Sequence, residues 1–164
     1  MSYLARSRLS DGIEVRRSAV EGQGLFASRR IEAGAELIVY GGRLATDDEV
    51  RLLRPHSSLA VGEGFSLIQQ DEDEAQYLNH SCDGNTWMLD AVTLVARRDI
   101  NAEEELTMDY VLVSGADPAW SMPCSCRSTL CRGAVTGSDW RLPELQERYR
   151  GHFSPFLNAR IGNK

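Results

Sequence analysis

The chain has 164 residues, of which 42% are hydrophobic and 26% charged, and its net charge at pH 7 is −6. This length suits one domain with an ordinary hydrophobic core, and the acidic balance argues against direct binding of nucleic acid. No segment is long and apolar enough to span a membrane, and the first residues lack the apolar stretch of a signal peptide. We therefore expect a cytoplasmic protein with reduced thiols and no membrane partner.

Short apolar groups separated by turn residues follow one another along the chain, which favours short strands over long helices. They are IEV (13–15), GLFA (24–27), ELIVY (36–40), FSLI (65–68), VTLVA (92–96) and ELTM (105–108). DDEVRLL (47–53) predicts a short helix with Thr46 as its N-cap. LPELQERYRGH (142–152) predicts a second helix, because Pro143 stands near its start and Gly151 near its end. The fold class expected is mostly β, with a short C-terminal helix.

An acidic run, DEDE, occupies positions 71–74. Runs of like charge usually lie in solvated loops, and we interpret this one in the same way. Attraction of a basic peptide is the alternative interpretation.

Four cysteines are present in the chain, and three of them form a C-x-C-x4-C pattern at Cys124, Cys126 and Cys131. Structural zinc takes four ligands, and Cys82 is the one remaining thiol. These residues indicate one structural Zn²⁺ site that joins the C-terminal segment to YLNHSC (77–82). Unligated thiols are the alternative.

A catalytic Cys–His pair is a second interpretation of YLNHSC, because His80 stands two residues before Cys82. A cysteine that binds zinc is not a free nucleophile, so the zinc hypothesis weakens this one. Four thiolates also leave no open position for water, which makes the expected metal structural rather than catalytic.

Four separate motifs occur in the order GQGLFA (22–27), YLNHSCDGN (77–85), EEELTMDY (103–110) and CSCRSTLCRG (124–133). Together they resemble the motifs of SET-domain protein lysine methyltransferases with a C-terminal post-SET zinc segment. The resemblance implies the SET fold, in which small β-sheets of the β-clip type surround a pseudoknot. It also implies a SET domain at 13–113, a post-SET segment at 120–135 and a C-terminal helix at 141–152.

The resemblance implies an enzyme that transfers methyl from S-adenosyl-L-methionine to a lysine amine of a histone or another basic protein, with S-adenosyl-L-homocysteine as product. His80 is expected to contribute partly through its backbone, and Asn79 through hydrogen bonds. The residues implied at the cofactor are Gly22, Gln23, Gly24, Leu25, Tyr77, Asn79 and His80.

The resemblance places Tyr110 at the methyl-transfer centre and Tyr40 in the wall of the substrate-lysine channel. Met88 and Met108 stand where a tyrosine restricts the product to monomethyl-lysine, so their lack of a hydroxyl favours di- or trimethylation. RGAVTG (132–137) lacks the aromatic residue that closes the channel in some relatives. Trp120 is the candidate replacement that we assign to the channel, with Trp140 as the alternative.

The sequence departs from the family pattern at Gln76, where arginine is usual, and at Gly84, where proline is usual. We expect the first change to remove a charge contact and the second to loosen a turn. A non-catalytic SET-like module that binds a cofactor or peptide is the alternative function. A purely structural zinc protein would leave GQGLFA and the tyrosines unused.

Overall fold

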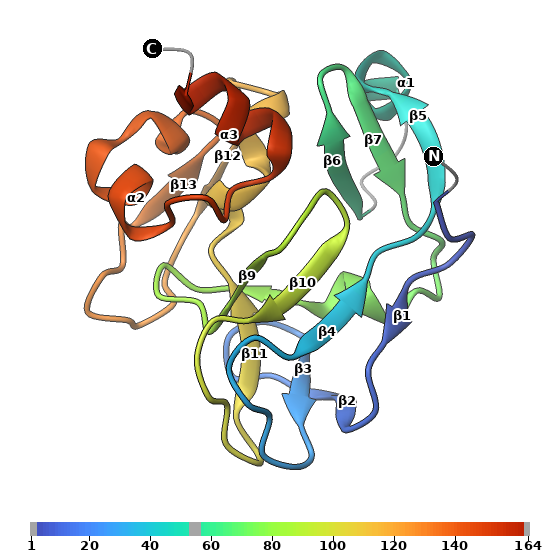
Figure 1. The fold of residues 1–164 in the computed structure, drawn as a ribbon, viewed down its shortest axis with the longest axis vertical. Helices are drawn as coiled ribbons and strands as arrows, with labels where there is room; N and C mark the ends of the chain where they lie inside the picture. The colour runs from blue at the N-terminus through green and yellow to red at the C-terminus, as the bar shows by residue number, and fades with distance from the viewer. Residues whose placement is uncertain (1–2, 53–56, 163–164) are drawn as a thin grey trace.

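The computed structural model describes residues 3–52 and 57–162. Its largest sheet has eight strands in the order β1-β4-β10-β9-β11-β3-β2, and β8 also pairs with β11 (Figure 1). The strands of this sheet are β1 (Arg8–Leu9), β2 (Ile13–Arg17), β3 (Gln23–Ala27), β4 (Glu36–Val39), β8 (Asn79–His80), β9 (Thr86–Met88), β10 (Thr93–Ala96) and β11 (Glu105–Met108).

Two smaller sheets lie at the other end of the molecule in Figure 1. One has the order β5-β7-β6 and the other is the pair β12-β13. Their strands are β5 (Arg43–Thr46), β6 (Ser58–Gly62), β7 (Phe65–Ile68), β12 (Ser121–Pro123) and β13 (Ala134–Thr136).

The helical segments are short, and no helix in the described part of the chain has the length and apolar character needed to cross a membrane. The α-helices are α1 (Asp47–Leu52), α2 (Pro143–Arg148) and α3 (Pro155–Gly162). The 3₁₀ turns are η1 (Glu74–Tyr77), η2 (Tyr110–Leu112), η3 (Ser114–Ala116) and η4 (Asp139–Arg141).

All six apolar groups of the sequence form strands, so the prediction of a mostly β fold is confirmed. The predicted N-cap of α1 is also present. The Glu49 N–H donates to Thr46 Oγ1 at 3.2 Å, and the Thr46 N–H donates back to Glu49 Oε2 at 2.8 Å. This reciprocal pair is a capping box. Leu53, the last residue of the predicted helix, lies outside the described residues.

The C-terminal region contains two helices, whereas the sequence analysis predicted one. Helix α2 ends at Arg148, and Gly151 has a φ of 78°, which suits glycine after a helix. Helix α3 then begins at Pro155, and the Asn158 N–H donates to the Ser154 carbonyl at 3.0 Å. Serine followed by proline is a helix-start signal that the sequence analysis did not use.

The acidic run at 71–74 is not wholly solvated, and the earlier interpretation is wrong for Asp73. This side chain is 1% exposed, and its carboxylate accepts the Ser7 N–H at 2.9 Å and the Ala75 N–H at 3.1 Å. Asp73 therefore caps η1 and ties it to the N-terminal segment. The other three carboxylates of the run are exposed.

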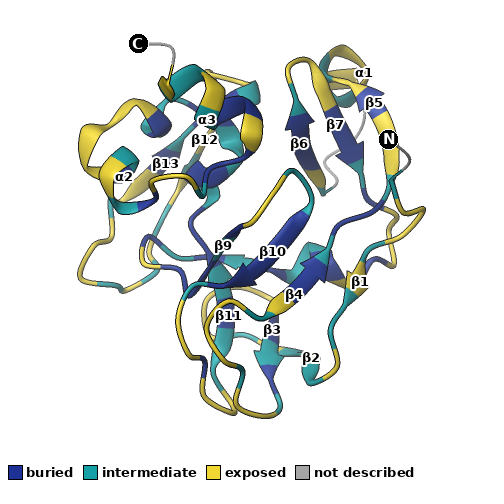
Figure 2. Ribbon diagram, in the orientation of Figure 1, coloured by how far each residue is buried: buried dark blue, intermediate teal, exposed yellow. Residues whose placement is uncertain are grey.

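Strand β11 brings the separate motifs of the sequence together. It pairs antiparallel with β3 and parallel with both β8 and β9. The register sets Thr107 beside Asn79 and Met108 beside His80. Figure 2 shows that β10, which pairs with β9, is buried along its length, as expected for a strand inside the core. The residues that follow β8 and β11 consequently meet at one place.

Candidate functional site

Asn79 connects the GQG segment to β11. Its Nδ2 lies 3.2 Å from the Glu21 carbonyl oxygen, 2.9 Å from the Gln23 carbonyl oxygen and 2.8 Å from Glu105 Oε1. The Ser18 hydroxyl lies 2.7 Å from the same carboxylate oxygen. These bonds hold the loop of residues 18–24 against the strand that leads to Tyr110.

The structure explains why both Gly22 and Gly24 of the GQG segment are glycine. Gly22 has a φ of 49°, in the left-handed region that disfavours residues with a Cβ. A Cβ on Gly24 would lie 2.2 Å from Glu105 Oε1, so a larger residue would displace this carboxylate. The loop therefore depends on glycine twice, once for conformation and once for space.

Tyr110 is held at both its ends. Its hydroxyl donates to the Leu78 carbonyl at 2.6 Å, and its backbone N–H donates to His80 Nδ1 at 3.2 Å. Burial, with a smaller contribution from the charge of Glu21, raises the pKa of the Tyr110 phenol to about 12. The side chain is therefore a neutral phenol at pH 7, with its proton directed at a carbonyl.

A pocket of about 480 Å³ opens beside Tyr110. Three other predicted channel residues, Tyr40, Met108 and Trp120, also line it. Tyr40 is 5% exposed, and burial, followed by the charges of Tyr110 and Asp73, raises the pKa of its phenol. The remaining wall is mostly small or apolar, and it includes Leu59, Ala60, Ala75, Leu78, Val113 and Ala116.

One predicted channel residue lies elsewhere: Met88 is fully buried in the core and does not line the pocket. Leu25 and Tyr77, predicted at the cofactor, are buried in β3 and half-buried at the end of η1, respectively. Trp140, the alternative to Trp120, is buried near the C-terminal helices, with the guanidinium groups of Arg141 and Arg160 over its ring. Of the two candidate tryptophans, Trp120 is the one at the pocket.

Cys82, Cys124 and Cys126 lie close together, and Cys131 adjoins this group at the Cys124 sulfur. The Cys124 sulfur lies 3.8 Å from the Cys82 sulfur and 3.8 Å from the Cys131 sulfur, and the Cys126 sulfur accepts the Cys82 N–H at 3.4 Å. Four sulfurs at about 2.3 Å from a tetrahedral zinc ion lie about 3.8 Å apart, whereas a disulfide needs about 2.05 Å. The donor set therefore fits a zinc ion.

His80 competes with Cys131 for the fourth ligand position, because its imidazole and the sulfurs of Cys82, Cys124 and Cys126 all lie within 4.8 Å of one another. The hydrogen bonds of the ring decide between them. Nδ1 accepts the Tyr110 N–H, so in the neutral ring Nε2 carries the proton, and it lies 3.3 Å from the Cys82 sulfur. Burial lowers the pKa of His80 and keeps the ring neutral. Nε2 would then donate to the Cys82 sulfur, and we expect Cys131, whose sulfur lies 3.8 Å from that of Cys124, to be the fourth ligand.

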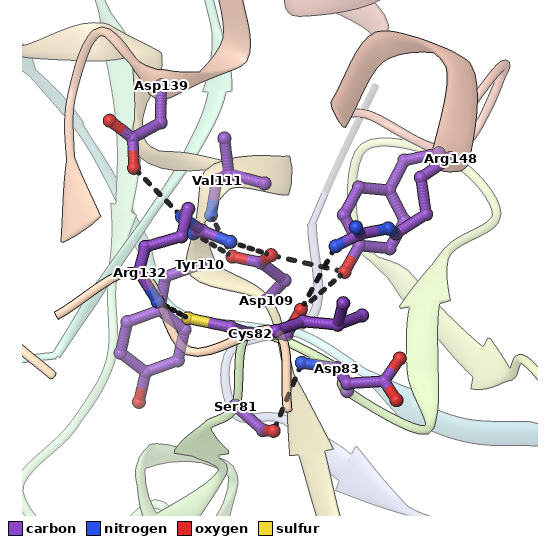
Figure 3. A network of polar contacts seen from close by, with 12 residues as sticks. Ser81, Cys82, Asp83, Asp109, Tyr110, Val111, Arg132, Asp139 and Arg148 are labelled. Atoms are coloured by element: carbon purple, nitrogen blue, oxygen red, sulfur yellow. Dashed lines mark hydrogen bonds and ion pairs between the residues drawn. The ribbon is translucent and has the colours of Figure 1, made fainter. Parts of the chain in front are cut away.

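A buried ionic network that the sequence analysis missed adjoins these groups (Figure 3). Arg132 donates from Nη1 to Asp109 Oδ2 and from Nη2 to Asp109 Oδ1, both at 2.7 Å. The Arg132 Nε also donates to Asp139 Oδ2 at 3.2 Å, and the Tyr149 hydroxyl donates to Asp109 Oδ2 at 3.1 Å. The available signals were the aspartate before Tyr110 and the arginine after Cys131, but no local pattern pairs them.

Comparisons with known proteins agree with this geometry. The SET domain family matches residues 22–111. The histone-lysine N-methyltransferase TRX1 of Oryza sativa subsp. japonica is 33% identical over 154 residues, which cover 82% of this chain and 14% of that protein. The chain thus spans a small part of the length of this relative.

Two solved structures have the same fold at low identity. The methyltransferase domain of human SETMAR has a TM-score of 0.60 and 21% identity, over 76% of this chain and 58% of that chain. KRYPTONITE in complex with mCHH DNA, an H3(1-15) peptide and SAH has a TM-score of 0.63 and 23% identity, over 77% of this chain and 30% of that chain.

The matched family defines the class of protein, and the predicted SET fold is confirmed. This chain belongs to the SET-domain family.

Proposed function

We propose that this chain is a protein-lysine N-methyltransferase that uses S-adenosyl-L-methionine. One observation carries the proposal: residues 78–80 connect the pocket beside Tyr110 to the GQG segment. The Leu78 carbonyl accepts the Tyr110 hydroxyl at the pocket, while the Asn79 amide holds the backbone of the GQG segment. A cofactor on the GQG side and a lysine in the pocket would therefore approach each other at Tyr110.

Bound on the GQG side, S-adenosyl-L-methionine would supply the methyl group of its sulfonium: a bond from the methyl carbon to the lysine nitrogen would form as the carbon–sulfur bond broke, with S-adenosyl-L-homocysteine as the leaving group. The amine must first lose a proton, which at pH 7 costs about 4.6 kcal/mol for a lysine with a pKa of about 10.4. The small and apolar residues around the pocket, such as Leu59, Ala60 and Leu78, disfavour the ammonium form and reduce this cost.

Tyr110 aligns the reacting groups and does not act as the base. Its pKa of about 12 and its hydrogen bond to the Leu78 carbonyl keep the phenol protonated. The oxygen lone pairs remain available to orient the amine and the methyl group, and the lysine proton leaves to water. Alignment of this kind contributes roughly 7–11 kcal/mol in favourable cases.

The proposed substrate is a lysine in a histone tail or another basic segment. The rice relative is named a histone-lysine N-methyltransferase, and the KRYPTONITE structure holds an H3 peptide. The net charge of −6 suits a basic peptide. Met108 offers no hydroxyl to the pocket, which favours di- or trimethylation.

The test measures transfer of labelled methyl from S-adenosyl-L-methionine to core histones and to a cell lysate. Wild type is expected to label lysine, and Tyr110→Phe is expected to be slower by about 100-fold, because the aligning hydroxyl is lost. Tyr3→Phe is the matched control, since Tyr3 does not line the pocket. The single lysine of the chain is Lys164, so self-labelling is confined to one residue.

Equal labelling by wild type and Tyr110→Phe would contradict the proposed mechanism. Binding of S-adenosyl-L-homocysteine without labelling of any substrate would instead favour the non-catalytic module. Mass spectrometry of the labelled lysine would give the number of methyl groups.

A further inference from the structure

We infer that Arg132 is a positioning residue that holds Tyr110 in place through Asp109. The inference rests on the proposed function, because it concerns the alignment that Tyr110 provides. It adds a residue that follows the last cysteine of the post-SET segment and touches neither the pocket nor the GQG segment.

Asp109 is the first link between Arg132 and Tyr110. Its side chain is fully buried, and its Oδ1 accepts the Val111 N–H at 3.2 Å, so it caps η2, the turn that begins with Tyr110. A carboxylate at this depth needs a compensating charge. The paired hydrogen bonds from Arg132 supply it, in the two-pronged geometry that a guanidinium forms and an ammonium does not.

Besides its ion pair with Asp109, Arg132 makes two further contacts. Its backbone N–H donates to the Cys82 sulfur at 3.4 Å, and its Nε donates to Asp139. Its side chain is 16% exposed, so water screens the ion pair only weakly. Arg132 therefore connects the cysteine cluster, η4 and the cap of η2 in one network.

The Tyr110 side chain is not part of this network. In Figure 3 its ring points away from the Asp109 carboxylate and the guanidinium. Arg132 therefore acts on Tyr110 through the turn and not through a contact with the ring. Without the guanidinium, the Asp109 carboxylate would turn toward other partners, and the turn that sets the Tyr110 hydroxyl against the Leu78 carbonyl would shift.

The first arm of the test compares Arg132→Met and Arg132→Lys with wild type in methyl transfer. We expect kcat of Arg132→Met to fall about tenfold or more, since misplacement of an aligning group by 1 Å costs up to about 100-fold. The KM for S-adenosyl-L-methionine should stay within about twofold, because Arg132 does not contact the GQG segment. The kcat of Arg132→Lys should lie between those of wild type and Arg132→Met, since lysine restores the positive charge but not the paired hydrogen bonds of the guanidinium. Arg141→Met is the matched control, an exposed arginine on η4 that does not bond to Asp109.

The second arm needs no activity. The chain contains five tyrosines, so protein labelled with 3-fluorotyrosine gives few ¹⁹F signals, which single Tyr→Phe variants assign. In Arg132→Met and Arg132→Lys the signals of Tyr110 and Tyr149 should move, while those of Tyr3 and Tyr77 stay in place. Zinc content, measured on the same samples, should equal that of wild type.

The inference is overturned if the Tyr110 signal is unchanged in both variants, or if the Tyr3 and Tyr77 signals move equally. It is also overturned if kcat is unchanged, or if a lower rate appears only together with lost zinc. If Arg132→Met does not fold, Arg132→Lys decides the outcome alone. A wild-type protein that methylates nothing would contradict the proposed function, while the ¹⁹F arm would still decide the role of Arg132.

Discussion

Gly84 lies in close contact with the backbone of β11. A Cβ at this position would come within 2.7 Å of the Thr107 carbonyl oxygen, 2.8 Å of the Asp109 nitrogen and 2.9 Å of the Met108 Cα. Its φ is not in the left-handed region, so the requirement is one of space and not of conformation. The sequence analysis expected glycine here to loosen a turn, whereas the structure shows close packing next to Asp109.

Gly84→Ala is therefore expected to destabilise the fold by about 1–3 kcal/mol, because the contacted atoms are backbone and cannot move aside cheaply. Urea unfolding measures the change. Gly62→Ala is the matched control, since a Cβ on Gly62 would meet nothing within 4 Å and its φ is not left-handed. A Gly84 variant as stable as the Gly62 variant would contradict the packing argument.

At the scale of elements, the segment from β12 to β13 has little structure of its own. The two strands have three residues each, and a two-stranded hairpin is marginal in water. The Cys124 N–H bonds to the Gly133 carbonyl, and Cys124, Cys126 and Cys131 lie in the loop that joins the strands. Zinc held by this loop and by Cys82 would fasten the segment to β8 and to η2.

Cys131→Ser, or treatment with a chelator, should remove the metal and release this segment. Structural zinc sites supply folding free energy, so amide exchange within 121–136 should become faster, while exchange in the distant β7 stays close to wild type. Hydrogen exchange read by mass spectrometry, with zinc analysis alongside, tests this expectation. Ser125→Ala, an exposed position in the same loop, should keep one zinc ion per chain. Full zinc content in Cys131→Ser would point to His80 as the fourth ligand.

At the scale of the whole molecule, two buried tyrosines and the half-buried Tyr110 make stability depend on pH in the alkaline range. Burial is the first cause of the raised pKa values of Tyr40, Tyr110 and Tyr149. In the unfolded chain these phenols ionise near their ordinary pKa of about 10. In the folded state these phenols stay protonated to higher pH. Their contribution to the free energy of unfolding is therefore complete below pH 10 and is lost as pH rises from 10 through the folded pKa values.

The free energy of unfolding should therefore fall steeply above pH 10. Tyr40→Phe should reduce the slope by up to about 1.4 kcal/mol per pH unit, since it removes one of the three groups. Urea titrations at pH values on either side of 10 measure both slopes. The same slope in wild type and Tyr40→Phe would mean that the buried phenol of Tyr40 does not contribute.

Local patterns in the sequence determined much of this protein. The turn-separated apolar groups predicted the strands, because side-chain burial follows the chain periodicity. Thr46 predicted the start of α1, because capping involves near neighbours only. The cysteine spacing indicated the zinc cluster, because few structures other than a metal site use so many close thiols.

Contacts between distant residues were decided by the tertiary structure alone. Tyr110 meets the Leu78 carbonyl because β11 pairs in parallel with β8, and no local signal specifies that pairing. Arg132 and Asp109 are 23 residues apart, and each is an ordinary charged residue until the fold buries both. The sequence therefore determined which groups are available, since local preferences and covalent spacing belong to the chain. The tertiary structure decided which of them meet, since burial and long-range pairing exist only in the folded molecule.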